Sequence, residues 1–261
     1  MILENETAII YGATGAIGTA VAQAMAREGA TLLLAARNEQ RLQEQAARLR
    51  AGGAMVYTGV VDATDAGSVT RHGDDLVSRH GRVDIMFNAI GWEDEQGIPL
   101  SQIELRTFLT PVTKALTTWH ATGGYWARHM AAQGRGVILG FTATAGHYPI
   151  SHVGGFGVAC AAVEAYLHQL GQEMGPEGVR VAAVRSAGSP DTPGLKEVFT
   201  NAARSANVSF EEIVRRNAAG AALRRMPSVA EAADAVVLLA SDYARAMTVT
   251  SANVTCGAAV D

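Results

Sequence analysis

The repeated order of a short apolar segment followed by a longer alanine-rich segment most constrains what this chain can fold into. The short segments have the length and β-branched content of strands, and the longer ones have the apolar spacing of amphipathic helices. This alternation predicts a parallel sheet covered by helices on both faces. The predicted strands are Thr7–Tyr11, Thr31–Ala35, Met55–Val61, Val83–Phe87, Gly136–Phe141, Val179–Arg185 and Met247–Val254. The predicted helices are Ile17–Arg27, Glu39–Arg50, Ser68–His80, Leu100–Ala132, Gly155–Met174 and Val229–Ala240.

The length of 261 residues suits one large α/β domain, and no repeat, low-complexity tract or charge block marks a linker. We therefore predict a single Rossmann-type, doubly wound domain over residues 1–261, with about seven parallel strands. The region Gly188–Pro227 interrupts the alternation of strands and helices, because it contains Pro190 and Pro193, several small polar residues and a helical segment near Phe210–Arg216. Its position before the last strand, together with its length, favours a lid over the ligand crevice rather than an irregular surface loop.

Composition excludes several classes of function. The net charge of −4 and the absence of a Lys/Arg run argue against a nucleic-acid partner, and no apolar run approaches the ~18 residues of a membrane span. Cys160 and Cys256 cannot build a disulfide framework, and the first residues lack a basic leader. We expect a cytoplasmic protein. The seven histidines show no metal-ligand spacing, so no metal site is predicted.

A glycine loop follows the first predicted strand and opens the first predicted helix. It reads Gly12-Ala-Thr14-Gly15-Ala-Ile17-Gly18. Glycine lets the backbone turn sharply and approach a pyrophosphate, which then rests on the helix N-terminus. A glycine loop alone is weak evidence, but strand, loop and helix occur here in the required order. The loop therefore predicts a dinucleotide site.

The end of the second predicted strand indicates which dinucleotide binds. Enzymes that select NAD usually place Asp or Glu there to bind the ribose 2′-hydroxyl, whereas this chain has Arg37 followed by Asn38. A guanidinium matches the geometry of a phosphate. NADP(H) is therefore favoured over NAD(H). The alternative is that Arg37 is a solvated surface residue.

These motifs, in this order along nearly the whole chain, resemble the short-chain dehydrogenase/reductase family. The glycine loop matches with Ala16 in place of the middle glycine, and Asp62 matches the family aspartate near the adenine. The segment Asn88-Ala89-Ile90-Gly91 resembles the Asn-Asn-Ala-Gly motif, and the segment from Ser186 to Thr192 resembles the one that borders the nicotinamide. The resemblance implies an NADP(H) site formed by Gly12, Thr14, Gly15, Ile17, Gly18, Arg37, Asn38, Asp62, Ala63, Asn88, Ala89, Gly91, Gly188 and Thr192.

The same resemblance implies a catalytic tetrad of asparagine, serine, tyrosine and lysine, which this chain lacks. In the family, the tyrosine exchanges a proton with the substrate and the lysine four residues later lowers its pKa. Here Ala143 stands at the serine position, Phe156 at the tyrosine position and Cys160 at the lysine position. The asparagine position falls at Ala115, with a one-residue uncertainty that admits Lys114. These residues are expected to line the substrate pocket without forming a proton relay.

Two other residues are weak candidates for an acid or base. Tyr148 and His152 stand four residues apart on the loop expected to overhang the nicotinamide, and an ordinary polar loop is the favoured interpretation. A local likeness to the enoyl-acyl-carrier-protein reductase branch surrounds Phe156 and continues into residues 180–188. That branch has its tyrosine seven residues before the lysine, where this chain has Val153.

Three functions remain open from the residues. The chain is expected to be an atypical NADP(H)-dependent oxidoreductase acting on a small molecule that the sequence does not identify. A substrate that is already electrophilic, such as an iminium ion or an activated alkene, would demand less from a protein acid. The alternatives are a catalytically silent nucleotide-binding sensor or partner subunit, and a lyase or isomerase that reuses the pocket. The resemblance also implies a homodimer or homotetramer.

Overall fold

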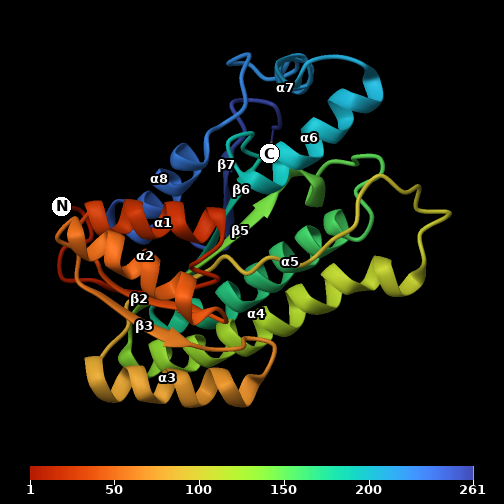
Figure 1. Ribbon diagram of the computed structural model, residues 1–261. Coiled ribbons are helices and arrows are strands. Elements are labelled where there is room, and N and C mark those ends of the chain that lie inside the picture. Colours follow the sequence, from red (N-terminus) through yellow and green to blue (C-terminus); the bar gives the residue numbers. More distant parts are fainter. Residues whose placement is uncertain (261) are drawn as a thin grey trace.

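A seven-stranded parallel sheet lies between two layers of helices (Figure 1) in the computed structural model, which describes residues 1–260. The strand order is β3-β2-β1-β4-β5-β6-β7, and every neighbouring pair is parallel. The predicted α/β fold class is therefore confirmed. The strands are β1 (Thr7–Tyr11), β2 (Thr31–Ala36), β3 (Val56–Val60), β4 (Ile85–Asn88), β5 (Gly136–Ala143), β6 (Val179–Ser186) and β7 (Thr250–Val254).

The two helical layers follow from the alternation of side chains along each strand. In β1, Ile10 packs toward the layer of α1, α2 and α8, whereas Ile9 packs toward the layer of α3, α4 and α5. The helices of the two layers are α1 (Ala16–Arg27), α2 (Glu39–Ala51), α3 (Ala66–His80), α4 (Leu105–Gln133), α5 (Phe156–Met174) and α8 (Val229–Ala240). Helix α4 starts five residues after the predicted Leu100, because residues 99–103 form a turn through the carbonyl of Pro99.

The strand order places the ligand crevice. The chain proceeds outward from β1 to β2 and β3, and then returns to β4 on the other side of β1. Ligands bind in doubly wound sheets outside the carboxyl ends of the strands that flank such a switch point. The residues that follow β1 and β4 therefore meet at the expected site.

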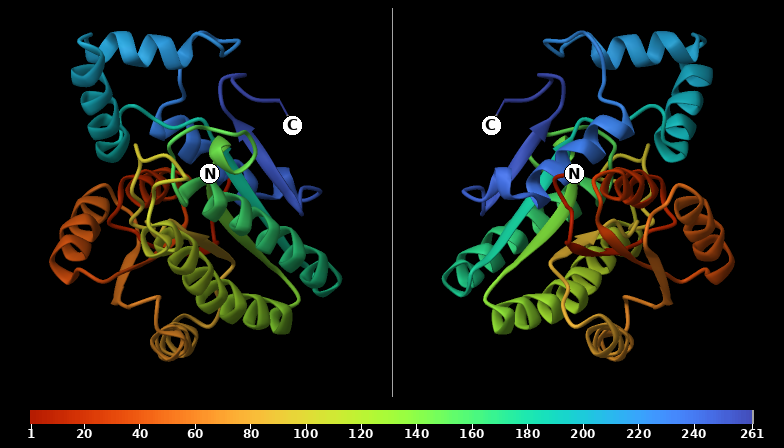
Figure 2. Two further views of the ribbon diagram at one scale, coloured as in Figure 1. Left: turned by 90° about the vertical axis from the view of Figure 1, so that its right-hand side faces the viewer. Right: turned by 90° about the vertical axis from the view of Figure 1, so that its left-hand side faces the viewer.

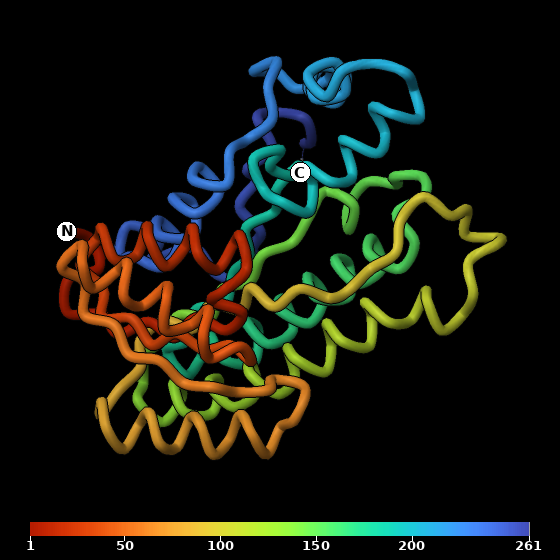
Figure 3. Tube along the Cα trace, viewed as in Figure 1, coloured from red at the N-terminus to blue at the C-terminus, as the bar shows by residue number. Residues whose placement is uncertain are grey.

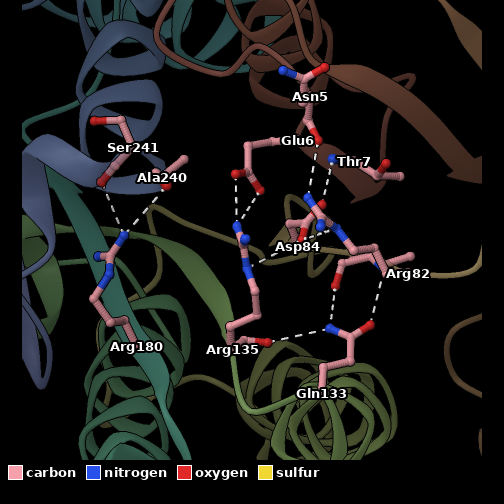
Figure 4. Close-up of polar contacts among 11 residues, drawn as sticks. Asn5, Glu6, Thr7, Arg82, Asp84, Gln133, Arg135, Arg180, Ala240 and Ser241 are labelled. Atoms are coloured by element: carbon pink, nitrogen blue, oxygen red, sulfur yellow. Dashed lines mark hydrogen bonds and ion pairs between the residues drawn. The ribbon is translucent and has the colours of Figure 1, made fainter.

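A cluster of charged side chains around the buried Asp84 holds together the opposite, amino end of the sheet (Figure 4). Asp84 accepts a 2.9 Å hydrogen bond from the backbone N–H of Thr7 and lies 2.8 Å from the Arg82 guanidinium. Arg135 contacts both Asp84 and Glu6, at 3.6 and 2.7 Å. These contacts fasten the starts of β1, β4 and β5 to one another, far from the crevice.

The region Gly188–Pro227 contains two helices, α6 (Pro193–Ala206) and α7 (Phe210–Ala218), where the sequence indicated only the second. Pro193 occupies the first turn of α6, a position at which its fixed φ favours a helix. The two helices share a small apolar cluster of their own around Phe199 and Ile213. Figure 2 shows both helices standing above the sheet, outside the two layers.

Candidate functional site

The glycine loop between β1 and α1 packs directly against the end of β4. Gly12 has a φ of +72°, and a Cβ there would lie 2.5 Å from the carbonyl oxygen of Ala89. Gly15 is the N-cap of α1, so the free N–H groups of that helix face the crevice. Gly18 approaches the backbone of Gly12 too closely for any side chain. The loop is therefore shaped for contact between backbone and ligand.

A cavity of about 370 Å³ opens at this switch point. It is lined by most of the predicted cofactor residues, which come from the ends of β1, β2, β3 and β4. These are Gly12, Thr14, Gly15, Arg37, Asn38, Asp62, Ala63, Ala89 and Gly91. Ile17, Gly18, Asn88, Gly188 and Thr192 do not line it.

Asn88 supports the cavity from behind, and Gly188 and Thr192 lie on a different loop. The buried side chain of Asn88 accepts a hydrogen bond from the N–H of Ile90 and donates one to Thr122, both at 3.0 Å, which orders the turn that carries Ala89. Gly188, with a φ of +90°, and Thr192 lie on the loop between β6 and α6. Thr192 is the N-cap residue of α6.

Charged groups gather at one end of the cavity. Asp62 accepts two hydrogen bonds from Thr64, and these bonds, with smaller contributions from Arg37 and Lys114, hold the pKa of its carboxyl below the ordinary value. Asn38 caps α2 by accepting a 2.9 Å hydrogen bond from the N–H of Arg41. Both side chains are therefore fixed by local contacts that the sequence spacing alone already favours.

Three charged residues that line the cavity were not predicted to bind the cofactor: Glu93, Lys114 and Arg41. Lys114 had been weighed only as an alternative at the asparagine position, and it forms an ion pair with Glu93. The scarcity of lysine could have drawn attention to it, because the chain has only Lys114 and Lys196. No sequence signal connects Glu93 with this end of the cavity.

The four residues that the family resemblance aligns with the catalytic tetrad lie in one apolar cluster with Trp92. Ala115 and Cys160 are fully buried, and Ala143 and Phe156 are partly buried against the same cluster. The ring centroids of Phe156 and Trp92 are 5.9 Å apart. The thiol of Cys160 lies against the backbone of Ala143, and burial raises its pKa to about 12. A thiol with that pKa stays protonated near neutral pH and is neither a base nor a cation.

A buried ion pair lies immediately behind these positions. Arg185 on β6 donates hydrogen bonds of 3.0 and 2.7 Å to the two carboxylate oxygens of Glu164 on α5. Thr142 on β5, the neighbour of Ala143, donates a 2.6 Å hydrogen bond to the same carboxylate. The three side chains connect β5, β6 and α5 just where the two strands end at the crevice.

The two weak catalytic candidates lie apart from the cavity. The Tyr148 hydroxyl hydrogen-bonds to the backbone of Val260, accepting from its N–H at 2.9 Å and donating to its carbonyl. His152 is exposed and has a φ of +64°, and its own carbonyl accepts a 2.7 Å hydrogen bond from Gly97. Neither residue lines the cavity. Tyr148 therefore fastens the end of the chain to the loop after β5.

Within residues 1–260, no group of three or more His, Cys, Asp or Glu side chains is placed to hold a metal ion. No helix in the same range is long and apolar enough to cross a membrane.

Comparison with known proteins bears on the family and the fold. A family model described as "Enoyl-(Acyl carrier protein) reductase" matches residues 12–259. The chain is 31% identical over 257 residues to "Granaticin polyketide synthase putative ketoacyl reductase 1" of Streptomyces violaceoruber, which covers 96% of this chain and 91% of that protein.

Solved structures superpose over nearly the full length. A variant of actinorhodin polyketide ketoreductase with NADPH has a TM-score of 0.87 at 26% identity, covering 97% of this chain and 96% of that chain. NAD⁺-bound xylitol dehydrogenase has a TM-score of 0.91 at 21% identity, covering 98% of this chain and 100% of that chain.

Proposed function

Since the chain belongs to the short-chain dehydrogenase/reductase family, we propose that it is an NADP(H)-dependent reductase whose active site lacks the tyrosine–lysine proton relay. Family membership makes a nicotinamide dinucleotide the cofactor class, and similar structures hold either NAD⁺ or NADPH. The ketoacyl reductases among the similar proteins support a reductase over the other family chemistries.

The cavity fits the cofactor. Gly12 and Gly15 leave room for a pyrophosphate against the N-terminus of α1, and Asp62 lines the cavity with a carboxylate that can accept a hydrogen bond from an adenine amino group. Arg37 lines the same cavity at the end of β2, and the strand end carries no carboxylate. This arrangement supports NADP(H) over NAD(H). When bound, the cofactor supplies the hydride.

The apolar cluster at the tetrad positions is the observation that carries the proposal of an atypical active site. Phe156 has no exchangeable proton, and the buried thiol of Cys160 does not titrate near neutral pH. These side chains can orient a substrate and exclude water, but they do not hold a proton for a carbonyl oxygen. The site is therefore matched to a substrate that needs little acid assistance, such as an iminium ion or an activated alkene.

Replacing Arg37 by alanine is expected to weaken NADPH binding by about 10–100-fold and to leave NADH binding nearly unchanged. The reason is the loss of charged hydrogen bonds to a 2′-phosphate, worth ~1.5–3 kcal/mol. Isothermal titration calorimetry measures both affinities. Arg48→Ala, an exposed position on α2, is the matched control. Failure of the wild type to bind either dinucleotide would refute the proposed function.

Adding a hydroxyl at position 156 tests whether the lack of a proton donor there limits the reduction of ketones. Wild-type turnover of simple ketones with NADPH is expected to be very slow, and Phe156→Tyr is expected to raise it by on the order of 10-fold, because a positioned acid contributes at least ~100-fold in favourable geometry. The measurement is NADPH oxidation with a ketone and with a cyclic imine. Fast ketone reduction by the wild type would contradict the proposal. Binding of NADPH without turnover of either substrate would favour the alternative of a catalytically silent nucleotide-binding sensor. The apolar side chains at positions 143, 156 and 160 are also compatible with that alternative.

A further inference from the structure

A carboxylate bridges two cations across one end of the cofactor cavity. Glu93 forms an ion pair with Lys114, and the same carboxylate oxygen lies 3.8 Å from the Arg37 guanidinium. We propose that Lys114 and Arg37 together bind the ribose 2′-phosphate, and that Glu93 holds the two cations in place until the phosphate displaces it. The inference rests on the proposed NADP(H) function and names a specificity-determining lysine that the family resemblance does not supply.

The three residues come from separate parts of the chain. Arg37 follows β2, Lys114 lies in the third turn of α4, and Glu93 belongs to the segment between β4 and α4. Figure 3 shows that segment, drawn in yellow, as a long excursion without regular structure. All three residues line the same cavity. An anion that reaches Arg37 from inside the cavity is therefore within the field of Lys114 as well.

Burial distinguishes Lys114 from an ordinary surface lysine. Its side chain is only 14% exposed, whereas those of Arg37 and Glu93 are 66% and 64% exposed. Lysine is seldom buried without a partner, because removing an ammonium group from water is costly. A partly desolvated cation also attracts an anion more strongly than a solvated one. Lys114 is therefore expected to attract the phosphate more strongly than the exposed Arg37 does.

Glu93 is suited to leave when a better anion arrives. Its backbone has a φ of +57°, a conformation that costs a non-glycine residue on the order of 1 kcal/mol. The hydrogen bond and charge of Lys114 hold the pKa of the Glu93 carboxyl below its ordinary value, so it is ionised at neutral pH. A phosphate monoester carries more charge and three acceptor oxygens, so it can contact ammonium and guanidinium together. A 2′-hydroxyl cannot replace the carboxylate in this way.

Two small probes test the inference without turnover. Adenosine 2′,5′-bisphosphate and adenosine 5′-monophosphate differ only in the 2′-phosphate, and calorimetry gives the affinity of each. Lys114→Met is expected to weaken binding of the bisphosphate by about 10-fold or more and that of the monophosphate by less than about 3-fold. Glu93→Gln is expected to tighten bisphosphate binding by about 3–10-fold, because the competing carboxylate is gone. Lys196→Met and Glu95→Gln, both at exposed positions, are the matched controls.

The outcomes separate this inference from the proposed function. If Lys114→Met weakens both probes equally, or if Glu93→Gln weakens the bisphosphate, the inference is wrong while NADP(H) binding stands. If the wild type binds neither probe nor NADPH, the proposed function itself fails.

A second readout uses the unaltered chain, whose only lysines are Lys114 and Lys196. Amine labelling followed by mass spectrometry is expected to show that the bisphosphate protects Lys114, that the monophosphate does not, and that Lys196 is unaffected. Equal protection of Lys114 by both probes would overturn the inference even if the lysine variant failed to fold.

Discussion

Replacing Glu164 by glutamine is expected to lower the free energy of unfolding by about 3–5 kcal/mol, because it removes the carboxylate charge that the buried Arg185 guanidinium contacts. The residues are only 7% and 5% exposed, and three hydrogen bonds reach the carboxylate. Glutamine keeps the shape of the side chain, so the loss reports charge rather than a cavity. Urea denaturation followed by circular dichroism measures it.

Two further variants show whether the charge pair is responsible. Glu173→Gln lies on the same helix at an exposed position and is expected to change stability by less than about 0.5 kcal/mol. Combining Glu164→Gln with Arg185→Met removes both charges and is expected to recover much of the loss. A Glu164→Gln protein as stable as the wild type would show that the pair contributes little.

The same pair gives a pH dependence with a definite sign. Burial alone would raise the pKa of the Glu164 carboxyl, but hydrogen bonds from Arg185 and Thr142 hold it below the ordinary value. A depressed folded-state pKa contributes stability that is fully present above the unfolded-state pKa of about 4.3 and is lost as the pH falls through the folded-state value. The stability gap between wild type and Glu164→Gln is therefore expected to be full at pH 7 and to shrink below about pH 4.

Replacing Gly12 by alanine is expected to weaken NADPH binding by more than about 100-fold and to lower stability as well. The φ of +72° penalises any L side chain by ~1–2 kcal/mol. The new Cβ would also lie 2.5 Å from the Ala89 carbonyl oxygen and 2.8 Å from the Ile90 nitrogen. Both are backbone atoms of the cavity wall, so the turn after β4 must move. Calorimetry with NADPH and thermal unfolding measure the two effects.

Gly53→Ala separates backbone strain from the loss of the binding surface. Gly53 has a φ of +89°, but a Cβ there meets nothing within 4 Å and lies outside the cavity. The Gly53→Ala variant is expected to have a free energy of unfolding lower by the same ~1–2 kcal/mol and to bind NADPH normally. If both variants bind NADPH like the wild type, then the close approach of Gly12 to β4 is unimportant for the cofactor.

Much of the fold could be predicted because its signals are local. The alternation of apolar runs with amphipathic segments located all seven strands, and the return of the chain across β1 follows from the doubly wound order. Helix α6 was missed, because prolines and small polar residues around Pro193 resemble a loop. Its helix is stabilised by packing of Phe199 on Ile213, which the sequence does not display.

The candidate site likewise has residues that local sequence signals predict and residues whose contacts only the folded structure shows. The residues of the glycine loop, together with Arg37 and Asp62, directly follow strands, so the switch-point rule brings them to one cavity. Tyr148 and His152 were predicted as weak acid or base candidates only because they lie close together on the loop expected to overhang the nicotinamide. The Tyr148 hydroxyl is engaged by Val260, which is 112 residues away and whose contact no spacing could indicate.

The sequence by itself determined the parallel α/β fold and the location of the glycine loop, and it supplied the alignment that predicts which residues occupy the tetrad positions. These features depend on periodicity and on short spacings, which a linear chain preserves. Only the tertiary structure decided that Glu93 lies between Lys114 and Arg37, that Arg185 is buried against Glu164, and that Tyr148 is occupied. Such contacts join residues from different elements, and their strength depends on burial and mutual orientation, which exist only once the sheet and its helices have packed.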